Sequence, residues 1–248
     1  MTAIQEFSPQ DHTSLARDVQ RHTRGAPSLE SAAQAFTQLL CNTFPHDIVL
    51  ARVFVTVPYG TLASDVRAAV DALTQQTGIR DRMRPDTLVL SLLGTSGAEA
   101  PWNDRKRSAG HAGIPLATSD FIDTIPMVAR LLRDLGVGLD WIDARDTSIV
   151  ARSLGSSSGL FYVQDAGVAV DHLRRKIIAA QDFVARYGVK TVFGLGGGYL
   201  GTSSYLASIV FCKTEIERAK IEPFMGLVNR IKVSTNDLVT QGRLFTSS

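Results

Sequence analysis

The sequence predicts one globular domain that contains both helices and strands. A valine-rich run at residues 48–57 alternates poorly between apolar and polar positions, as a strand buried on both faces does. Two apolar runs at 189–195 and 205–212 flank the glycine-rich residues 196–201, a pattern typical of a β-hairpin. Apolar residues recur at helical spacing after Ser28 and again after Thr214. At 248 residues the chain is long enough to bury a sizeable core.

The composition of the chain argues against several classes of protein. A net charge of +2 with scattered cations disfavours a nucleic-acid surface. Since no apolar run approaches the ~20 residues that cross a bilayer, and the first residues lack a signal-peptide pattern, we expect a cytoplasmic protein with no membrane segment. Cys41 and Cys212 lie far apart and outside any paired spacing, which predicts buried thiols and not a disulfide or a zinc site.

The first third of the chain predicts two helices, a strand and a third helix. Residues 1–27 are expected to form an N-terminal helical arm, and residues 28–248 the domain proper. The expected elements are a helix capped by Ser8 that ends near Arg21, a helix capped by Ser28 that stops near Phe44 and Pro45, a strand at 48–57 ended by Pro58 to Gly60, and a helix over 62–76 ended by Gly78.

The remaining elements alternate between strands and helices. They are a strand at 88–93, a helix from Ser119 and Asp120 to Gly136, a loop at 155–159, a strand at 160–163, a helix or an extended connection at 165–181, the hairpin, and a long helix from Thr214 with Glu215 and Glu217 in its first turn. Pro126 lies inside the predicted helix at 119–136, so that helix either kinks there or begins late.

The surrounding sequence argues against three common functional motifs. Gly196, Gly198 and Gly201 have the spacing of a dinucleotide-binding loop, but the residues after them favour a strand, so no helix N-terminus would receive a pyrophosphate. The five histidines never reach metal-ligand spacing, and we expect no metal site. No serine lies in a nucleophile-elbow sequence, which argues against a serine hydrolase.

The chemically densest segment is 102–111, which lies between two apolar runs and is flanked by glycines. Trp102 could supply a flat wall, Arg105 a bidentate donor for a carboxylate or phosphate, and His111 a group that titrates near neutrality. The alternative is structural: Trp102 would fill the edge of the core, and Asp104 would pair with a neighbouring cation. The residue types alone leave both interpretations open.

A series of short segments carries a family resemblance. They are Leu50-Ala51-Arg52-Val53-Phe54-Val55-Thr56-Val57-Pro58-Tyr59, Leu92-Leu93-Gly94-Thr95-Ser96-Gly97, Trp102-Asn103-Asp104-Arg105 with Ser108, Gly110-His111, Ile114-Pro115-Leu116, Ile125-Pro126-Met127, Gln181-Asp182-Phe183-Val184, and Tyr187-Gly188-Val189 with the strand from Thr191 to Gly194. In this order they resemble the GAF-type sensory domain, as found at the front of bacterial signalling proteins such as sensor kinases. The resemblance covers roughly residues 28–235.

The resemblance implies an α+β fold with a central antiparallel sheet of about six strands, helices on one face, and connections that form a pocket on the other. No residue with an established chemical role in the family maps here, and neither cysteine lies in a tetrapyrrole-attachment context, so a covalent bilin is not expected. The chain shows no phospho-acceptor histidine box, kinase ATP lid, cyclase or helix-turn-helix segment. If it stands alone, it would signal through a partner or by oligomerising.

The sequence therefore predicts a cytoplasmic, non-catalytic, GAF-like sensor or regulatory domain with N-terminal and C-terminal helices. A small, anionic ligand of unknown identity would contact Trp102, Asn103, Arg105, Ser108 and His111. No cofactor can be named. The chain would form a homodimer through its N-terminal helix and the helix from Thr214, and would act on a signalling protein.

Two alternatives remain open at this stage. One is a small-molecule enzyme in which Asp104 and His111 act as an acid/base pair. The other is an interaction scaffold with a filled interior, in which Trp102 would be fully buried with no cavity beside it.

Overall fold

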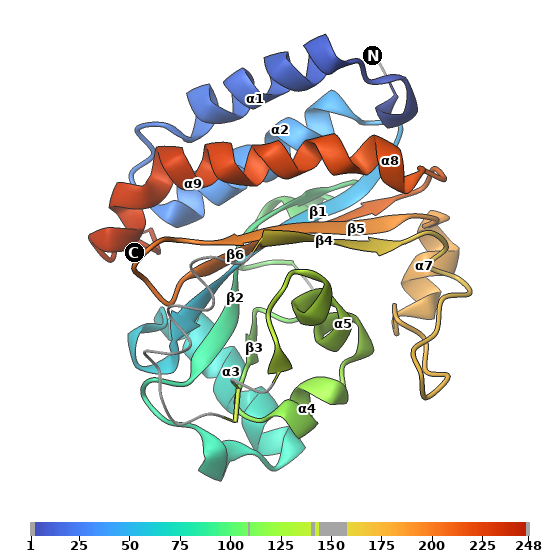
Figure 1. Ribbon diagram of the computed structural model, residues 1–248. Coiled ribbons are helices and arrows are strands. Elements are labelled where there is room, and N and C mark those ends of the chain that lie inside the picture. Colours follow the sequence, from blue (N-terminus) through green and yellow to red (C-terminus); the bar gives the residue numbers. More distant parts are fainter. Residues whose placement is uncertain (1–2, 109, 140–141, 144–157, 247–248) are drawn as a thin grey trace.

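A computed structural model describes residues 3–108, 110–139, 142–143 and 158–246 (Figure 1). Its centre is one antiparallel sheet of six strands in the order β3-β2-β1-β6-β5-β4. The strands are β1 (Ile48–Pro58), β2 (Leu88–Gly97), β3 (Gly113–Pro115), β4 (Ser158–Val163), β5 (Val192–Gly198) and β6 (Tyr205–Cys212). The predicted α+β class, the antiparallel sheet and the hairpin around 196–201 are thus confirmed. Of the loop predicted at 155–159, residues 155–157 lie outside the described residues.

Strand β1 lies at the middle of the sheet, paired with β2 on one side and β6 on the other. All of its residues are buried except Arg52 and Pro58, which are half-buried, as predicted for a strand covered on both faces. The register with β2 shifts between Val53 and Phe54, which face Gly94 and Leu92, so Leu93 is the extra residue of a β-bulge.

Three long helices cover one face of the sheet: α1 (Pro9–Thr23), α2 (Leu29–Thr43) and α9 (Met225–Thr240) (Figure 1). Both predicted caps are present, since the side chains of Ser8 and Ser28 accept the backbone N–H groups of Asp11 and Ser31. The N-terminal segment is part of this layer, because Val19 of α1 is fully buried and Thr23 bonds to Ser234 of α9 at 2.5 Å.

The long helix predicted from Thr214 begins later than expected. A short helix α8 (Arg218–Ile221) is followed by a 3-10 turn (Glu222–Phe224) and only then by α9. Pro223 explains the break, because it has no N–H to continue a regular helix. The predicted apolar stripe exists, but Ile221, Leu227 and Ile231 are at most 2% exposed against their own chain. The stripe is therefore covered by the chain itself and is not free for the homodimer contact that was expected of the helix from Thr214.

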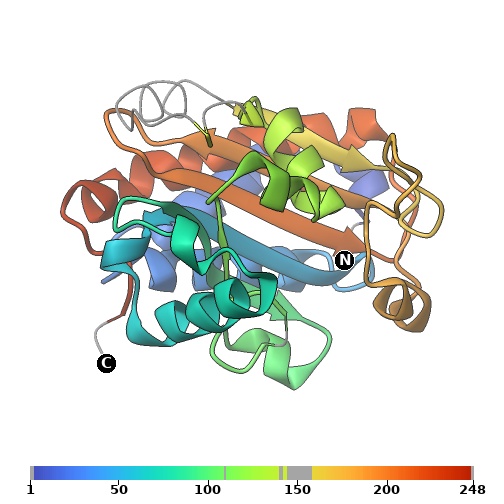
Figure 2. The same ribbon diagram turned by 90° about the horizontal axis from the view of Figure 1, so that it is seen from below.

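Shorter helices and connections cover the opposite face (Figures 1 and 2). They are α3 (Ser64–Thr77), α4 (Ser119–Asp123), α5 (Pro126–Asp134) and α7 (Gln181–Tyr187). The helix expected at 119–136 is two helices, because Pro126 occupies the first turn of α5 and so starts a new one. Residues 165–180 form an extended connection with a short bridge between Val170 and Lys176. No helix in the described residues is long and apolar enough to cross a membrane.

Candidate functional site

A cavity of about 410 Å³ opens between the sheet and the elements on the face opposite the long helices. Its floor comes from β1 and β6, and its walls come from the 102–111 segment, the start of α5, residues 177–180 and α7. The lining residues are Leu50, Arg52, Trp102, Gly110, His111, Ile125, Pro126, Met127, Val128, Ile177, Ile178, Ala179, Ala180, Phe183 and Phe211. Among the described residues, this lining includes no carboxylate.

Arg52 supplies the positive charge of this cavity. It is the one charged residue of a mostly apolar strand, and its Nη2 donates a hydrogen bond to Ser108 Oγ at 2.9 Å. Burial lowers the pKa of Arg52, but a guanidinium keeps its proton at neutral pH. Gly110 lies directly against it, with φ of 113°, and a Cβ at that position would come within 2.9 Å of Arg52 Nη1. The 102–111 segment is therefore shaped to fit the Arg52 side chain.

His111 is the titratable group beside Arg52. Burial lowers its pKa, and the positive charge of Arg52 lowers it further. The imidazole is therefore neutral at pH 7, with one nitrogen that donates and one that accepts. The cavity thus combines a fixed cation with a neutral group that can bond a polar atom of either kind.

Trp102 forms one end of an aromatic wall. Its ring centroid lies 5.8 Å from that of Phe183 and 4.9 Å from that of Tyr187, and Phe183 contacts Phe211 of the floor at 5.4 Å. The hydroxyl of Tyr187 donates to Glu99 at 2.9 Å, which ties α7 to the turn before Trp102. Trp102 is half-buried and lines the cavity, so the two features expected of a filled scaffold are not seen.

Asn103 and Arg105 do not line this cavity. The Asn103 amide is used within its own turn, where it accepts from Ser96 Oγ at 2.8 Å and donates to the Gly97 carbonyl at 3.2 Å. Arg105 turns toward the helices, where its guanidinium lies 2.7 Å from Glu30 of α2 and 2.6 Å from Asp65 of α3. These carboxylates draw Arg105 away from the position that the sequence suggested.

Asp104 and His111 line different cavities. Asp104 lies in a hollow of about 350 Å³ next to Arg105, and its carboxylate accepts the backbone N–H of Lys106 at 2.9 Å. The acid/base pair of the enzyme alternative is therefore not assembled. Of the five predicted ligand contacts, the structure brings together Trp102, His111 and, through its bond to Arg52, Ser108. Arg52 was missed, although a cation within an apolar strand is a readable signal.

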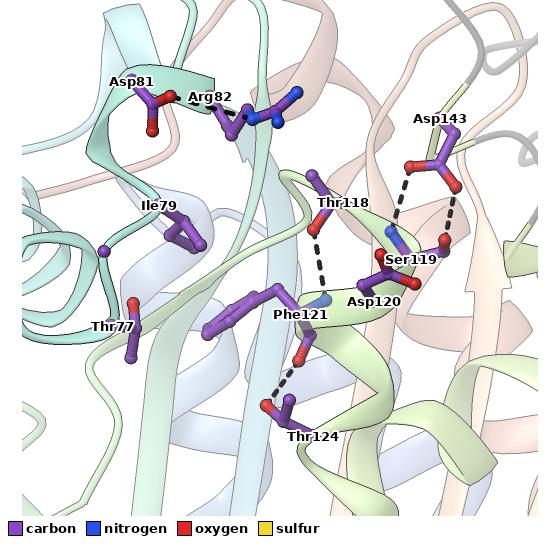
Figure 3. Close-up of a pocket in the computed structure, with 11 residues that line it drawn as sticks. Thr77, Ile79, Asp81, Arg82, Thr118, Ser119, Asp120, Phe121, Thr124 and Asp143 are labelled. Atoms are coloured by element: carbon purple, nitrogen blue, oxygen red, sulfur yellow. Dashed lines mark hydrogen bonds and ion pairs between the residues drawn. The ribbon is translucent and has the colours of Figure 1, made fainter.

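A wider cavity of about 840 Å³ lies between the end of α3 and α4 (Figure 3). Its polar groups largely serve local structure: Ser119 donates its backbone N–H to Asp143 at 3.1 Å, and Thr118 Oγ1 caps α4 by accepting the N–H of Phe121 at 3.1 Å. Within the described residues, no group of three or more histidine, cysteine or acidic side chains could hold a metal ion. Among the described residues that line this wide hollow, the charged side chains are all exposed, unlike that of Arg52.

The fold defines an α+β domain in which an antiparallel six-stranded sheet lies between two helical layers. Among solved structures, the chain is similar to the phycoerythrobilin-bound GAF domain of a cyanobacterial phytochrome, at 12% identity over 93% of this chain and 97% of that one, with a TM-score of 0.48. It is also similar to the GAF domain of a phosphoenolpyruvate-protein phosphotransferase from Coxiella burnetii, at 13% identity over 95% and 98%, with a TM-score of 0.46.

A third similar structure is the chromophore-binding domain of a bacteriophytochrome from R. palustris, at 9% identity over 94% of this chain and 62% of that one, with a TM-score of 0.47. The solved structures to which the chain is similar thus include GAF domains. No family model matches the chain, and no curated protein matches it in sequence. The chemistry of the cavity must therefore be judged from its own residues.

Proposed function

We propose that the chain is a cytoplasmic, non-catalytic sensory domain that binds a small amphiphilic anion in the 410 Å³ cavity. The observation that carries this proposal is the half-buried guanidinium of Arg52 on the floor of a cavity that, apart from His111, is lined mainly by apolar and aromatic side chains. Cavities for small molecules are mostly apolar with a few placed polar groups, and their usual volumes of roughly 300–1,000 Å³ include this one.

The lining favours a particular kind of ligand. A carboxylate or a similar anion would accept hydrogen bonds from Arg52, and the neutral imidazole of His111 could donate another. An aromatic or branched apolar body would then lie against Trp102, Phe183 and Met127. A fully polar ligand would lose hydration along most of this surface without gaining partners.

The signal would leave the domain through a protein partner or a second copy of the chain. The apolar stripe of α9 is not available for a homodimer, so a dimer would use the outer surface of the long helices, where Val233 is 74% exposed. Analytical ultracentrifugation of wild-type protein and of Val233→Glu tests this arrangement. A dimer that the substitution leaves intact would show that this surface is not the interface.

Ligand binding can be tested with two fluorescent probes that differ by one sulfonate group: anilinonaphthalene sulfonate (ANS), which is an anion, and its uncharged parent, phenylnaphthylamine. We expect Arg52→Met to weaken ANS binding about tenfold, since charge-assisted hydrogen bonds contribute roughly 1.5–3 kcal/mol. Binding of the neutral probe should change little. Arg107→Met is the matched control, because Arg107 lies on the same segment but is exposed.

If Arg52→Met leaves ANS binding unchanged while circular dichroism shows an intact fold, the anion site is not at Arg52 and the proposal fails. Native mass spectrometry of the purified protein complements this test. A mass excess that disappears on gentle unfolding, and that is absent from Arg52→Met, would identify a natural ligand held in the cavity.

A further inference from the structure

A smaller cavity of about 300 Å³ lies behind one wall of the ligand cavity. Pro126 and Ile177 line both cavities and so form a shared wall between them. The rest of the smaller cavity is lined by Ala129, Arg130, Arg133, Asp134, Val170, Asp171, His172 and Arg175. Three guanidinium groups therefore surround a hollow that is directly adjacent to the proposed ligand site.

The rim of this hollow is a small hairpin, residues 168–176, held in one conformation by its own hydrogen bonds. The Asp171 carboxylate accepts the N–H groups of Leu173 at 2.9 Å and Arg175 at 2.8 Å, and it pairs with Arg175 Nε at 2.7 Å. Arg174 has φ of 63°, the one positive value at a non-glycine residue in the described part of the chain. Such strain persists only where surrounding bonds over-determine the backbone, and it is common at functional sites.

The hairpin holds apolar side chains out in solvent. Val168 is 66% exposed, Val170 42% and Leu173 56%. Among the described residues, five large apolar side chains are exposed, and three of them lie within these six positions. A hairpin that presents a cluster of exposed apolar groups is typical of a contact surface for another molecule.

The charges around the hairpin favour an acidic partner. Arg130, Arg133, Arg174, Arg175 and Lys176 provide five cations, whereas the neighbouring carboxylates are the four of Asp123, Asp134, Asp165 and Asp171. In three of the four ion pairs the cation is the more exposed member: 39% against 32% for Arg130 and Asp134, 47% against 37% for Arg133 and Asp123, and 34% against 10% for Arg175 and Asp171. In the fourth, Arg175 with Asp123, the two side chains are exposed to a similar extent, 34% against 37%.

We propose that the hairpin 168–176 and the hollow beside it form the docking site for a protein segment that carries acidic side chains between apolar ones. An acidic side chain would enter the hollow between Arg130 and Arg133, while apolar side chains cover Val168 and Leu173. A protein is favoured over a lipid surface because the exposed apolar residues are aliphatic and the cations are already partly neutralised by aspartates.

This surface would be the output face of the proposed sensor, and only the coupling between the two sites rests on the proposed function. Because Pro126 and Ile177 contact both cavities, a ligand that moves this wall would alter docking. Any such effect must be reciprocal, so the factor by which ANS changes the affinity of the partner segment equals the factor by which that segment changes the affinity of ANS.

The test uses fluorescence anisotropy of a short fluorescein-labelled peptide of alternating glutamate and leucine, with a matched peptide in which glutamine replaces glutamate. We expect the acidic peptide to bind, and Leu173→Ser and Arg133→Gln each to weaken it about tenfold. Leu200→Ser and Arg82→Gln are the matched controls, since these side chains are 78% and 67% exposed and lie outside the hairpin and the hollow. They should leave binding unchanged.

The docking proposal would be overturned by no binding at about 1 mM peptide, by equal binding of the glutamine peptide, or by equal loss of binding in the Leu200 and Leu173 variants. Binding to vesicles of phosphatidylcholine and phosphatidylglycerol that depends on Leu173 would instead assign the surface to a membrane, and would also overturn it. ANS titration of the Leu173→Ser protein distinguishes this test from the test of the proposed ligand site. ANS binding should be unchanged in this variant, because Leu173 does not line the ligand cavity.

Discussion

Arg105 should contribute to the stability of the fold and not to ligand binding. Its side chain is 6% exposed and lies between Glu30, which is 14% exposed, and Asp65, which is 41% exposed. Replacing Arg105 with methionine would leave the Glu30 carboxylate nearly buried, with the backbone N–H of Thr246 as a remaining donor at 3.0 Å. Breaking a buried ion pair from one side costs about 3–5 kcal/mol, whereas the half-exposed Asp65 contact adds at most about 1 kcal/mol.

Because methionine keeps much of the aliphatic packing of arginine, we expect Arg105→Met to lower the free energy of unfolding by about 3 kcal/mol. For a chain of this length that corresponds to a fall in Tm of about 6–12 °C. Urea denaturation followed by circular dichroism measures the change, with the exposed Arg107→Met as the control. Asp65→Asn should cost about 1 kcal/mol or less.

The same variant should bind ANS with wild-type affinity, because Arg105 does not line the cavity. Unfolding within about 0.5 kcal/mol of wild type would show that the ion pairs provide no net stability and would refute the reasoning. Loss of ANS binding with unchanged stability would instead support the ligand-binding role that the sequence suggested for Arg105.

Two further predictions concern pH and packing. The pKa of His111 in the folded state lies below 6.5, so its neutral form contributes stability that is fully present above about pH 6.5 and falls as the pH decreases. Urea denaturation midpoints measured between pH 7.5 and 5 should therefore depend less steeply on pH in His111→Gln than in the wild type. An equally steep dependence in the variant would assign the effect to another group. Gly94→Ala should cost about 3 kcal/mol or prevent folding, because its Cβ would lie 2.4 Å from the Ala33 carbonyl carbon. Gly197→Ala meets the flexible end of Lys232 at 3.0 Å and a methyl group of Val228 at 3.2 Å, with no backbone atom among its nearest neighbours, and should lower Tm less.

Helix and strand positions were predictable where the signals are local. Ser8, Ser28 and Gly78 act on backbone groups within a few residues, and each ends or begins a helix where the sequence indicated. Pro126 and Pro223 could not be interpreted alone, because a proline can end one helix or begin the next. Which of these occurs depends on the elements packed around it, and the sequence pattern does not contain that information.

The candidate site was predictable in part. Trp102 and His111 stood out because a tryptophan and a histidine within a charged, glycine-flanked segment fit neither a core strand nor a solvated loop. Arg105 was misplaced because its two partners, Glu30 and Asp65, lie 75 and 40 residues away in the sequence, so no local pattern could show the ion pairs. Arg52 supplies the charge that Arg105 was expected to supply.

The position of β1 at the centre of the sheet affects how the chain can fold while it is being synthesised. Its neighbour β6 comes much later, and the Thr56 hydroxyl accepts the backbone N–H of Tyr205 across a separation of 149 residues. At roughly 5–20 residues per second, a ribosome needs about 7–30 s to make the intervening chain. During that time an almost wholly apolar strand has one unpaired edge, which is a template for aggregation. The yield of folded protein in a cell should therefore depend on translation speed and chaperones, even for variants whose finished fold is as stable as the wild type.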